Sequence, residues 1–132
     1  MINKNSGFTL VEFMVAIVIL MVGMLGMLQG INIAMSQNVE SMMRNEATSL
    51  ADELMLQKRA KSFTSISTTT ANPAWVLKPR YLRGFNKDYS VQQIVSMATA
   101  TNSKEIVINV TWNYKNKTGS HSVSSIVSTS PD

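Results

Sequence analysis

Glu12 is a charged residue inside a long apolar run, and its position needs a chemical explanation. Residues 8–28 read FTLVEFMVAIVILMVGMLGML, and no charged residue occurs from 13 to 39. A carboxylate inside a membrane costs about 2–3 kcal/mol or more, so such residues usually have a function. One interpretation places Glu12 at the level of the lipid headgroups, where the cost is small. The other requires a positive partner, and a free amine at the start of a nearby helix would serve.

The apolar run has the length and composition of a membrane-spanning helix. About 20 helical residues cross the hydrocarbon core, and this run contains no proline. Lys4 and the chain's amino group precede it, which predicts a cytoplasmic N-terminus and an exported C-terminal part. A secretory signal cleaved near residues 34–36 is one alternative, although its apolar core would be only about 7–15 residues long. A plain signal anchor is another.

Three glycines, Gly23, Gly26 and Gly30, lie in the second half of this run. Small residues at such spacing can mark contacts between helices. Glycine is also simply commoner in membrane helices than in soluble ones. A third interpretation is local unwinding, because each glycine weakens a helix by about 1 kcal/mol relative to alanine. The sequence leaves all three interpretations open.

Residues 4–12, KNSGFTLVE, resemble the prepilin processing motif of type IV pilins and type II secretion pseudopilins. The resemblance implies that residues 1–7 are a leader, that a prepilin peptidase cuts after Gly7, and that Phe8 is then N-methylated. It also implies that Glu12 attracts the N-terminal amine of a neighbouring subunit during assembly. The continuation, AIVILMVGMLGMLQ at residues 16–29, is most similar to PilV-like minor pilins.

The pattern becomes amphipathic from residue 39 onward. Apolar residues recur there at helical i, i+3, i+4 and i+7 spacing, and basic residues follow where the helix should end. With no strong breaker between the two stretches, one continuous helix is predicted over residues 8–61. We expect 8–30 to be its membrane and assembly half and 31–61 its amphipathic half. The expected apolar stripe comprises Val39, Met42, Met43, Ala47, Leu50, Ala51 and Leu54.

The C-terminal part is predicted to be a small exported β-sheet head over residues 62–132. A Ser/Thr-rich connector comes first, and the prolines and glycine of residues 72–88 predict an irregular loop. Alternating apolar residues then predict strands at 89–99, 105–114 and 120–129, with a turn at 115–119. The predicted fold class is therefore α+β, a long N-terminal helix packed on an antiparallel sheet.

The predicted loop contains four basic residues interleaved with aromatic ones. Such a mixture can bind single-stranded nucleic acid through charge and stacking. Solvated basic residues around a few buried aromatic residues give the same composition, and we favour that interpretation because no nucleic-acid-binding motif accompanies it. Nucleic acid is therefore not an expected partner. The basic residues are Lys78, Arg80, Arg83 and Lys87, and the aromatic residues are Trp75, Tyr81 and Phe85.

The residue types needed for catalysis or metal binding are scarce. The 132 residues include one histidine, His121, and no cysteine, so typical zinc and thiolate sites are not expected. The net charge of +4 is a mild excess and is not concentrated in one block. Asp52 and Glu53 are adjacent on the predicted helix and therefore diverge. We expect no enzyme activity, no cofactor and no metal.

The resemblance implies a minor pilin subunit of a type IV pilus. Its expected partners are other pilins, the prepilin peptidase and the inner-membrane assembly platform. Its expected location is the inner membrane as precursor and the pilus at the cell surface afterwards. One alternative is a type II secretion pseudopilin. Another is a single-pass anchored binding module that never assembles and is not cleaved at Gly7.

Overall fold

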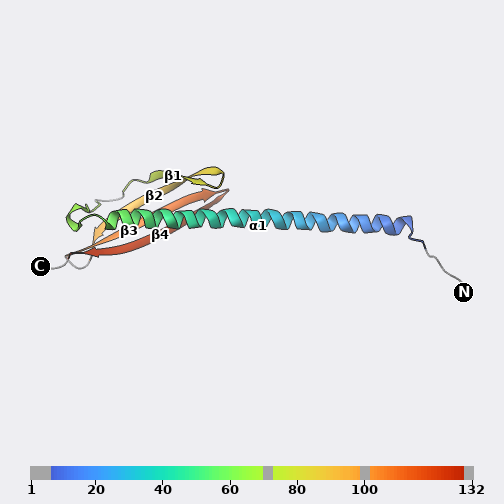
Figure 1. Ribbon diagram of the computed structural model, residues 1–132, viewed down its shortest axis with the longest axis horizontal. Coiled ribbons are helices and arrows are strands. Elements are labelled where there is room, and N and C mark those ends of the chain that lie inside the picture. Colours follow the sequence, from blue (N-terminus) through green and yellow to red (C-terminus); the bar gives the residue numbers. More distant parts are fainter. Residues whose placement is uncertain (1–6, 70–72, 99–101, 130–132) are drawn as a thin grey trace. The chain divides into compact units, whose positions relative to one another are not determined.

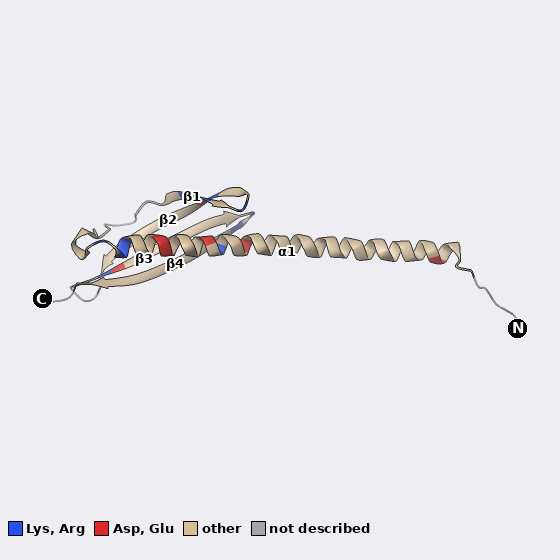
Figure 2. Cartoon of the chain, viewed as in Figure 1, with Lys and Arg blue, Asp and Glu red and all other residues tan. Residues whose placement is uncertain are grey.

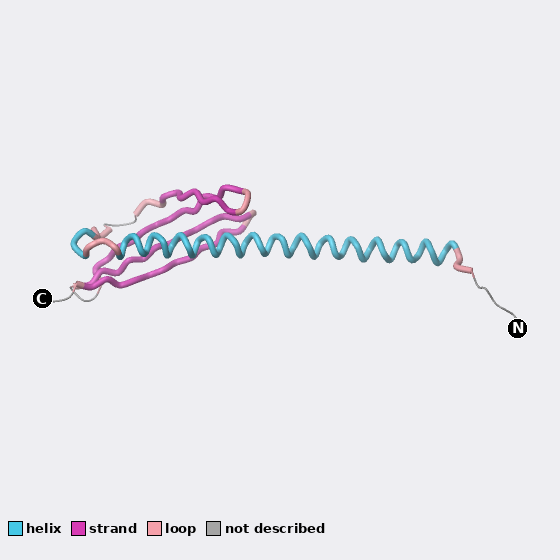
Figure 3. The backbone as a smooth tube through the Cα atoms, in the orientation of Figure 1, coloured by secondary structure: helices cyan, strands magenta, loops and turns pink. Residues whose placement is uncertain are grey.

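The computed structural model describes residues 7–69, 73–98 and 102–129. The elements in this part of the chain run from a long helix to four strands, as Figure 3 shows. The chain divides into two compact units, one reaching Val39 and the other starting at Glu40. The elements are α1 (Leu10–Arg59), the 3-10 turn η1 (Phe63–Ser65), β1 (Val76–Leu82), β2 (Phe85–Met97), β3 (Ser103–Tyr114) and β4 (Lys117–Ser128).

The first unit contains the apolar part of α1. Its residues from Leu10 to Met35 are all exposed; Leu20 is 60% exposed and Leu25 is 61% exposed. Among the described residues, α1 is the one helix whose length and hydropathy suffice to cross a membrane. Figure 2 shows the change in charge along the helix, from an almost uncharged first part to a second part with acidic and basic residues.

In the second unit, the rest of α1 packs against the sheet. Its buried residues recur at helical spacing and form one stripe, because side chains three and four positions apart share a helix face. The predicted stripe is confirmed for its five central and C-terminal members, whereas Val39 and Met42 are half-buried. The buried residues are Met43, Ala47, Leu50, Ala51, Leu54 and Met55.

The sheet in the described residues has the order β1-β2-β3-β4, and each strand pairs antiparallel with the next. β3 alternates between buried and half-exposed residues along most of its length, so one face meets α1 and the other meets solvent. This alternation confirms the half-buried strand predicted there and the α+β fold class. Figure 1 shows the second part of α1 lying along the sheet.

The predicted irregular loop at residues 72–88 is wrong for most of its length. Residues 76–82 form β1, and a two-residue turn at Arg83 and Gly84 leads into β2 at Phe85. Gly84 has φ +108°, a conformation that glycine adopts without steric cost. Pro79 is tolerated because β1 is an edge strand, where one side of the backbone needs no partner.

The other three strands also begin earlier in the chain than predicted. β2 begins at Phe85 rather than at 89 and ends at Met97, and the predicted strand end at 99 lies outside the described residues. The predicted turn at 115–119 contains only Lys115 and Asn116, and Gly119 belongs to β4. Gly119 pairs with Trp112, whose indole ring occupies the space where a Cβ would otherwise lie.

A buried lysine connects the segment after α1 to the sheet. Lys104 Nζ donates hydrogen bonds to the carbonyl oxygens of Phe63 at 2.8 Å and Ile66 at 2.7 Å. The same ammonium lies 4.3 Å from the centre of the Phe63 ring, within range of a cation–π interaction. Burying this charge is tolerable because it is hydrogen-bonded, and the connector is thereby held at the end of the core.

Candidate processing and assembly site

The start of α1 is capped by reciprocal hydrogen bonds between Thr9 and Glu12. The Thr9 backbone N–H and hydroxyl donate to Glu12 Oε2 at 2.9 and 3.0 Å. The Glu12 backbone N–H donates in return to the Thr9 hydroxyl oxygen at 3.3 Å. This is a capping box, which satisfies backbone donors that the first helical turn leaves without partners.

The predicted cleavage point lies just outside the helix. Gly7, Phe8 and Thr9 precede the first helical residue, and Phe8 is 82% exposed. A peptide bond in non-helical, exposed backbone is accessible to a peptidase without any unfolding of α1. The remaining leader residues, 1–6, including Lys4, lie outside the described residues.

Glu12 is fully exposed on α1, and its carboxylate has no ion-pair partner among the described residues of the chain. Its hydrogen bonds with Thr9 stay within one helical turn and introduce no positive charge. A cation from another molecule could therefore approach the carboxylate. The hydrogen bonds with Thr9 account for the helix-capping role of Glu12. Its negative charge is left to pair with a cation from another molecule.

The three glycines of the apolar run lie within continuous α1. A Cβ built at Gly23, Gly26 or Gly30 would meet nothing within 4 Å, so no packing in the chain requires glycine there. The helix continues through all three positions. Packing against another helix and local unwinding during assembly both stay predictions.

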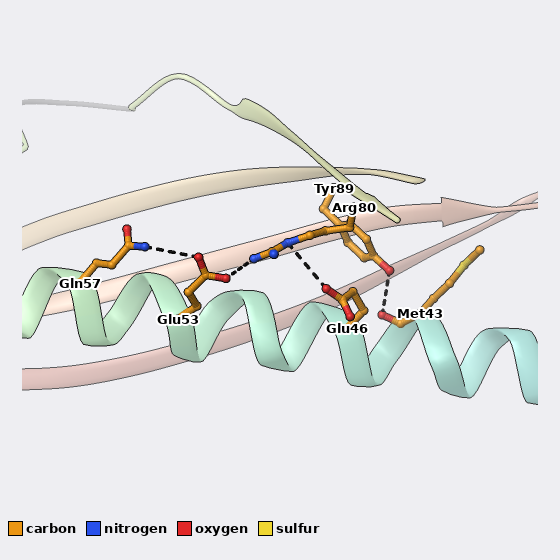
Figure 4. A network of polar contacts seen from close by, with 6 residues as sticks. All are labelled: Met43, Glu46, Glu53, Gln57, Arg80 and Tyr89. Atoms are coloured by element: carbon orange, nitrogen blue, oxygen red, sulfur yellow. Dashed lines mark hydrogen bonds and ion pairs between the residues drawn. The ribbon is translucent and has the colours of Figure 1, made fainter. Parts of the chain in front are cut away.

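A second polar cluster joins α1 to β1 in the head, as Figure 4 shows. Arg80 Nε lies 3.6 Å from Glu46 Oε1, and Arg80 Nη2 donates to Glu53 Oε2. Gln57 Nε2 also donates to Glu53, at 3.3 Å. Nearby, the Tyr89 hydroxyl donates to the Met43 carbonyl oxygen at 3.1 Å.

This cluster changes the interpretation of the four basic residues considered for nucleic-acid binding. Arg80 pairs with carboxylates of α1, so its role in the head is structural. Lys78 lies two residues before Arg80 on the same face of β1, Tyr81 lies on the opposite face, and Arg83 is in the turn. Phe85 and Lys87 of β2 share the face of Arg80, so strand alternation does not separate all the basic residues from the aromatic ones. That nucleic acid is an unlikely partner stays a prediction.

The start of the chain matches a known family motif. Residues 2–28 match the prokaryotic N-terminal methylation motif. This match supports a type IV pilin-like or pseudopilin-like protein. The motif implies processing by a peptidase and assembly with other pilins in a membrane system, and with the apolar helix it supports membrane anchoring. No curated protein and no solved structure matches the chain.

Two features of these sites were not predicted from the sequence. Thr9 has a local signal, because Thr9-Leu-Val-Glu12 fits the capping-box pattern of Ser or Thr followed three residues later by Glu. Arg80 has no such signal, since its partners on α1 are distant in sequence. Only the pairing of β1 with the rest of the sheet places this guanidinium against Glu46 and Glu53.

Proposed function

We propose that the chain is a minor pilin of a type IV pilus, cut after Gly7, N-methylated on Phe8 and assembled through the apolar part of α1. One observation carries the proposal: the methylation motif leads directly into an apolar helix whose side chains are exposed in the described part of the chain. Such a surface requires lipid before assembly and other apolar surfaces afterwards. The proposed role is structural and requires no catalytic group.

Glu12 is proposed to set the register between subunits. After cleavage, the Phe8 amine would be a cation at the N-terminal end of a helix, where the helix dipole disfavours positive charge. A neighbour's Glu12 carboxylate would compensate that charge inside an apolar bundle, where an unpaired charge is costly. The capping box holds this carboxylate at a defined place on its helix.

Cleavage and location are tested by the intact mass of the protein, recovered separately from cell membranes and from sheared surface filaments. We expect the mass of residues 8–132 plus one methyl group in both fractions. The same mass confined to membranes would instead indicate a type II secretion pseudopilin. A mass that starts at Met1, in cells with an active prepilin peptidase, would contradict the proposal and leave an anchored binding module. Gly7→Ile should leave the precursor uncut.

The role of the Glu12 charge can be separated from its role in helix capping. Glu12→Gln removes the charge but keeps a side chain that can complete a capping box. Thr9→Ala removes the capping hydroxyl but keeps the charge. We expect Glu12→Gln to be cleaved normally and to be reduced at least about tenfold in filaments, since an unpaired buried charge costs several kcal/mol. We expect Thr9→Ala to assemble.

Normal filament recovery of Glu12→Gln would refute the proposed charge pairing. A loss of filaments in Thr9→Ala as large as that in Glu12→Gln would assign the effect to the helix start instead. Cleavage, read from the membrane fraction, serves as the control in both variants, because an uncut chain cannot report on assembly.

A further inference from the structure

A basic hollow lies in the head between the last turns of α1 and the β1–β2 pair. Two depressions of about 320 and 240 Å³ share Lys58, Lys78 and Gln93 in their walls. Lys61 and Gln57 line the smaller depression as well. No carboxylate occurs among the described residues that line either one.

The neighbouring part of the contact between α1 and β1 contains carboxylates, which the hollow lacks among its described lining residues. Arg80 lies two residues beyond Lys78 on β1 and is neutralised by Glu46 and Glu53 from α1. Farther along, the hollow is lined by Leu54, Gln57 and Lys58 of α1 and by Lys61, which follows the helix. The interface therefore changes from complementary charges to like charges, and among the described residues no ion pair compensates the lysines of the hollow.

The helix dipole accounts for part of this arrangement. Lysines in or just after the last turn of α1 are favoured by its negative end. The dipole gives no reason for a third lysine from the sheet, nor for two glutamine side chains in the same walls. Lysines that line one depression repel each other, and an anion bound between them would relieve that repulsion.

We propose that this hollow binds a phosphate group or a similar tetrahedral oxyanion. Lysine acts as a compact point charge for phosphate, whereas planar carboxylates are matched best by the fork of arginine. The lysines reach the hollow from β1 and from the end of α1, and Gln93 can add an amide donor, whereas the Gln57 amide nitrogen already donates to Glu53. The larger volume is at the low end of small-molecule sites, which suits a single phosphorylated group. This inference does not depend on the proposed pilus role.

The test uses the full chain in a non-ionic detergent at neutral pH, titrated with inorganic phosphate at constant ionic strength. Heat of binding and the unfolding temperature of the head are both measured. We expect saturable binding and a rise in the unfolding temperature with phosphate concentration. Lys78→Gln should weaken binding by about fivefold or more, because one charge-assisted contact is lost.

Lys117→Gln is the matched control, because Lys117 is exposed at the start of β4 and the change in charge is the same. It should bind phosphate like the unchanged protein. Without phosphate, Lys78→Gln should unfold at the same or a slightly higher temperature, since a like-charge contact is removed. Weak binding by a well-folded Lys78→Gln variant would then reflect the lost ammonium group.

Three results would overturn the proposal. Phosphate could give no saturable heat and no shift in unfolding temperature. Lys117→Gln could lose as much binding as Lys78→Gln, which would indicate general charge screening. Acetate at the same ionic strength could bind as tightly as phosphate, which would exclude selectivity for a tetrahedral oxyanion.

Discussion

The two parts of α1 contain similar apolar residues in opposite surroundings. From Leu10 to Met35, all the residues of α1 are exposed. After Glu40, a narrow stripe that includes Ala47 and Leu50 is almost completely buried against the sheet. The first part therefore exposes apolar surface that lipid or another molecule can cover. The apolar stripe of the second part is already covered by the sheet.

The same contrast holds for the charged groups. Glu12 is a charge in an apolar stretch, and its hydrogen bonds reach only as far as Thr9. In the head, Glu46 and Glu53 meet Arg80 from a strand that is distant in sequence. The paired charges of the head stabilise the fold, whereas we propose that the unpaired charge of Glu12 contacts another molecule.

Leucine truncation in each part gives the largest expected difference. Leu50 is 2% exposed, so Leu50→Ala should reduce the free energy of unfolding of the head by about 2–5 kcal/mol. Leu20 is 60% exposed in the chain, so Leu20→Ala should change that free energy by less than about 0.5 kcal/mol. Urea unfolding of the full chain in detergent, followed by tryptophan fluorescence, measures both.

The two leucine substitutions should differ in the opposite direction when filament assembly is measured. If the first part of α1 packs against other subunits, Leu20→Ala should reduce filament recovery although the head remains stable. Equal destabilisation of the head by both substitutions would show that the first part of the helix supports the head, contrary to the contrast drawn above.

Glycine-to-alanine substitutions should act in opposite directions in the two regions. A Cβ at Gly119 would lie 2.4 Å from Cε2 of Trp112, so Gly119→Ala must displace the indole ring. Such overpacking costs about 1–3 kcal/mol. A Cβ at Gly26 meets nothing, so Gly26→Ala should stabilise the helix by up to about 1 kcal/mol. Unfolding of the head measures the first, and circular dichroism during heating in detergent measures the second.

An unchanged unfolding midpoint in Gly119→Ala would mean that Trp112 can move aside without loss. A decrease in helix stability in Gly26→Ala would mean that glycine has a structural role there that the isolated chain does not show. Filament recovery of Gly26→Ala adds a further comparison, since a glycine needed for close packing or unwinding should affect assembly alone.

The fold class was predictable because the apolar residues of the helix and those of β3 each recur with a clear period. The buried stripe on α1 follows helical spacing, and β3 alternates strictly through Ile106, Ile108 and Val110. β1 was missed for a physical reason. It is an edge strand with most of its side chains exposed, so no alternation marks it, and Pro79 and Gly84 resemble loop residues.

The candidate sites divide in the same way. Gly7, Phe8 and Glu12 lie within one short stretch, so the local sequence is enough to propose a processing and assembly site there, which stays a prediction. The pairing of Arg80 with Glu53 spans 27 residues, and the lysines of the hollow come from α1 and β1. No local sequence pattern predicts these contacts, because they depend on how β1 is placed against α1.

The pH dependence of the head should depend on one buried phenol. Burial and the nearby Glu46 carboxylate raise the pKa of Tyr89 to about 12, from an ordinary value of 10. Because the folded state favours the protonated phenol, its contribution is complete below pH 10 and is lost as pH rises from 10 towards 12. Its hydroxyl can donate to the Met43 carbonyl oxygen only while protonated.

Tyr89→Phe should therefore cost about 1 kcal/mol of head stability at pH 7, through the lost hydrogen bond. Between pH 10 and 12 its stability should fall less steeply than that of the unchanged protein. Tyr81→Phe is the control, because Tyr81 is 74% exposed and the variant should keep the steep fall. All other alkaline groups are common to the variants, so equal slopes in Tyr89→Phe and the unchanged protein would remove Tyr89 as the cause. If Tyr81→Phe instead removed the steep fall in stability, the pH dependence would come from Tyr81 on the outer face of β1. Tyr89, at the contact between α1 and the sheet, would then not be its cause.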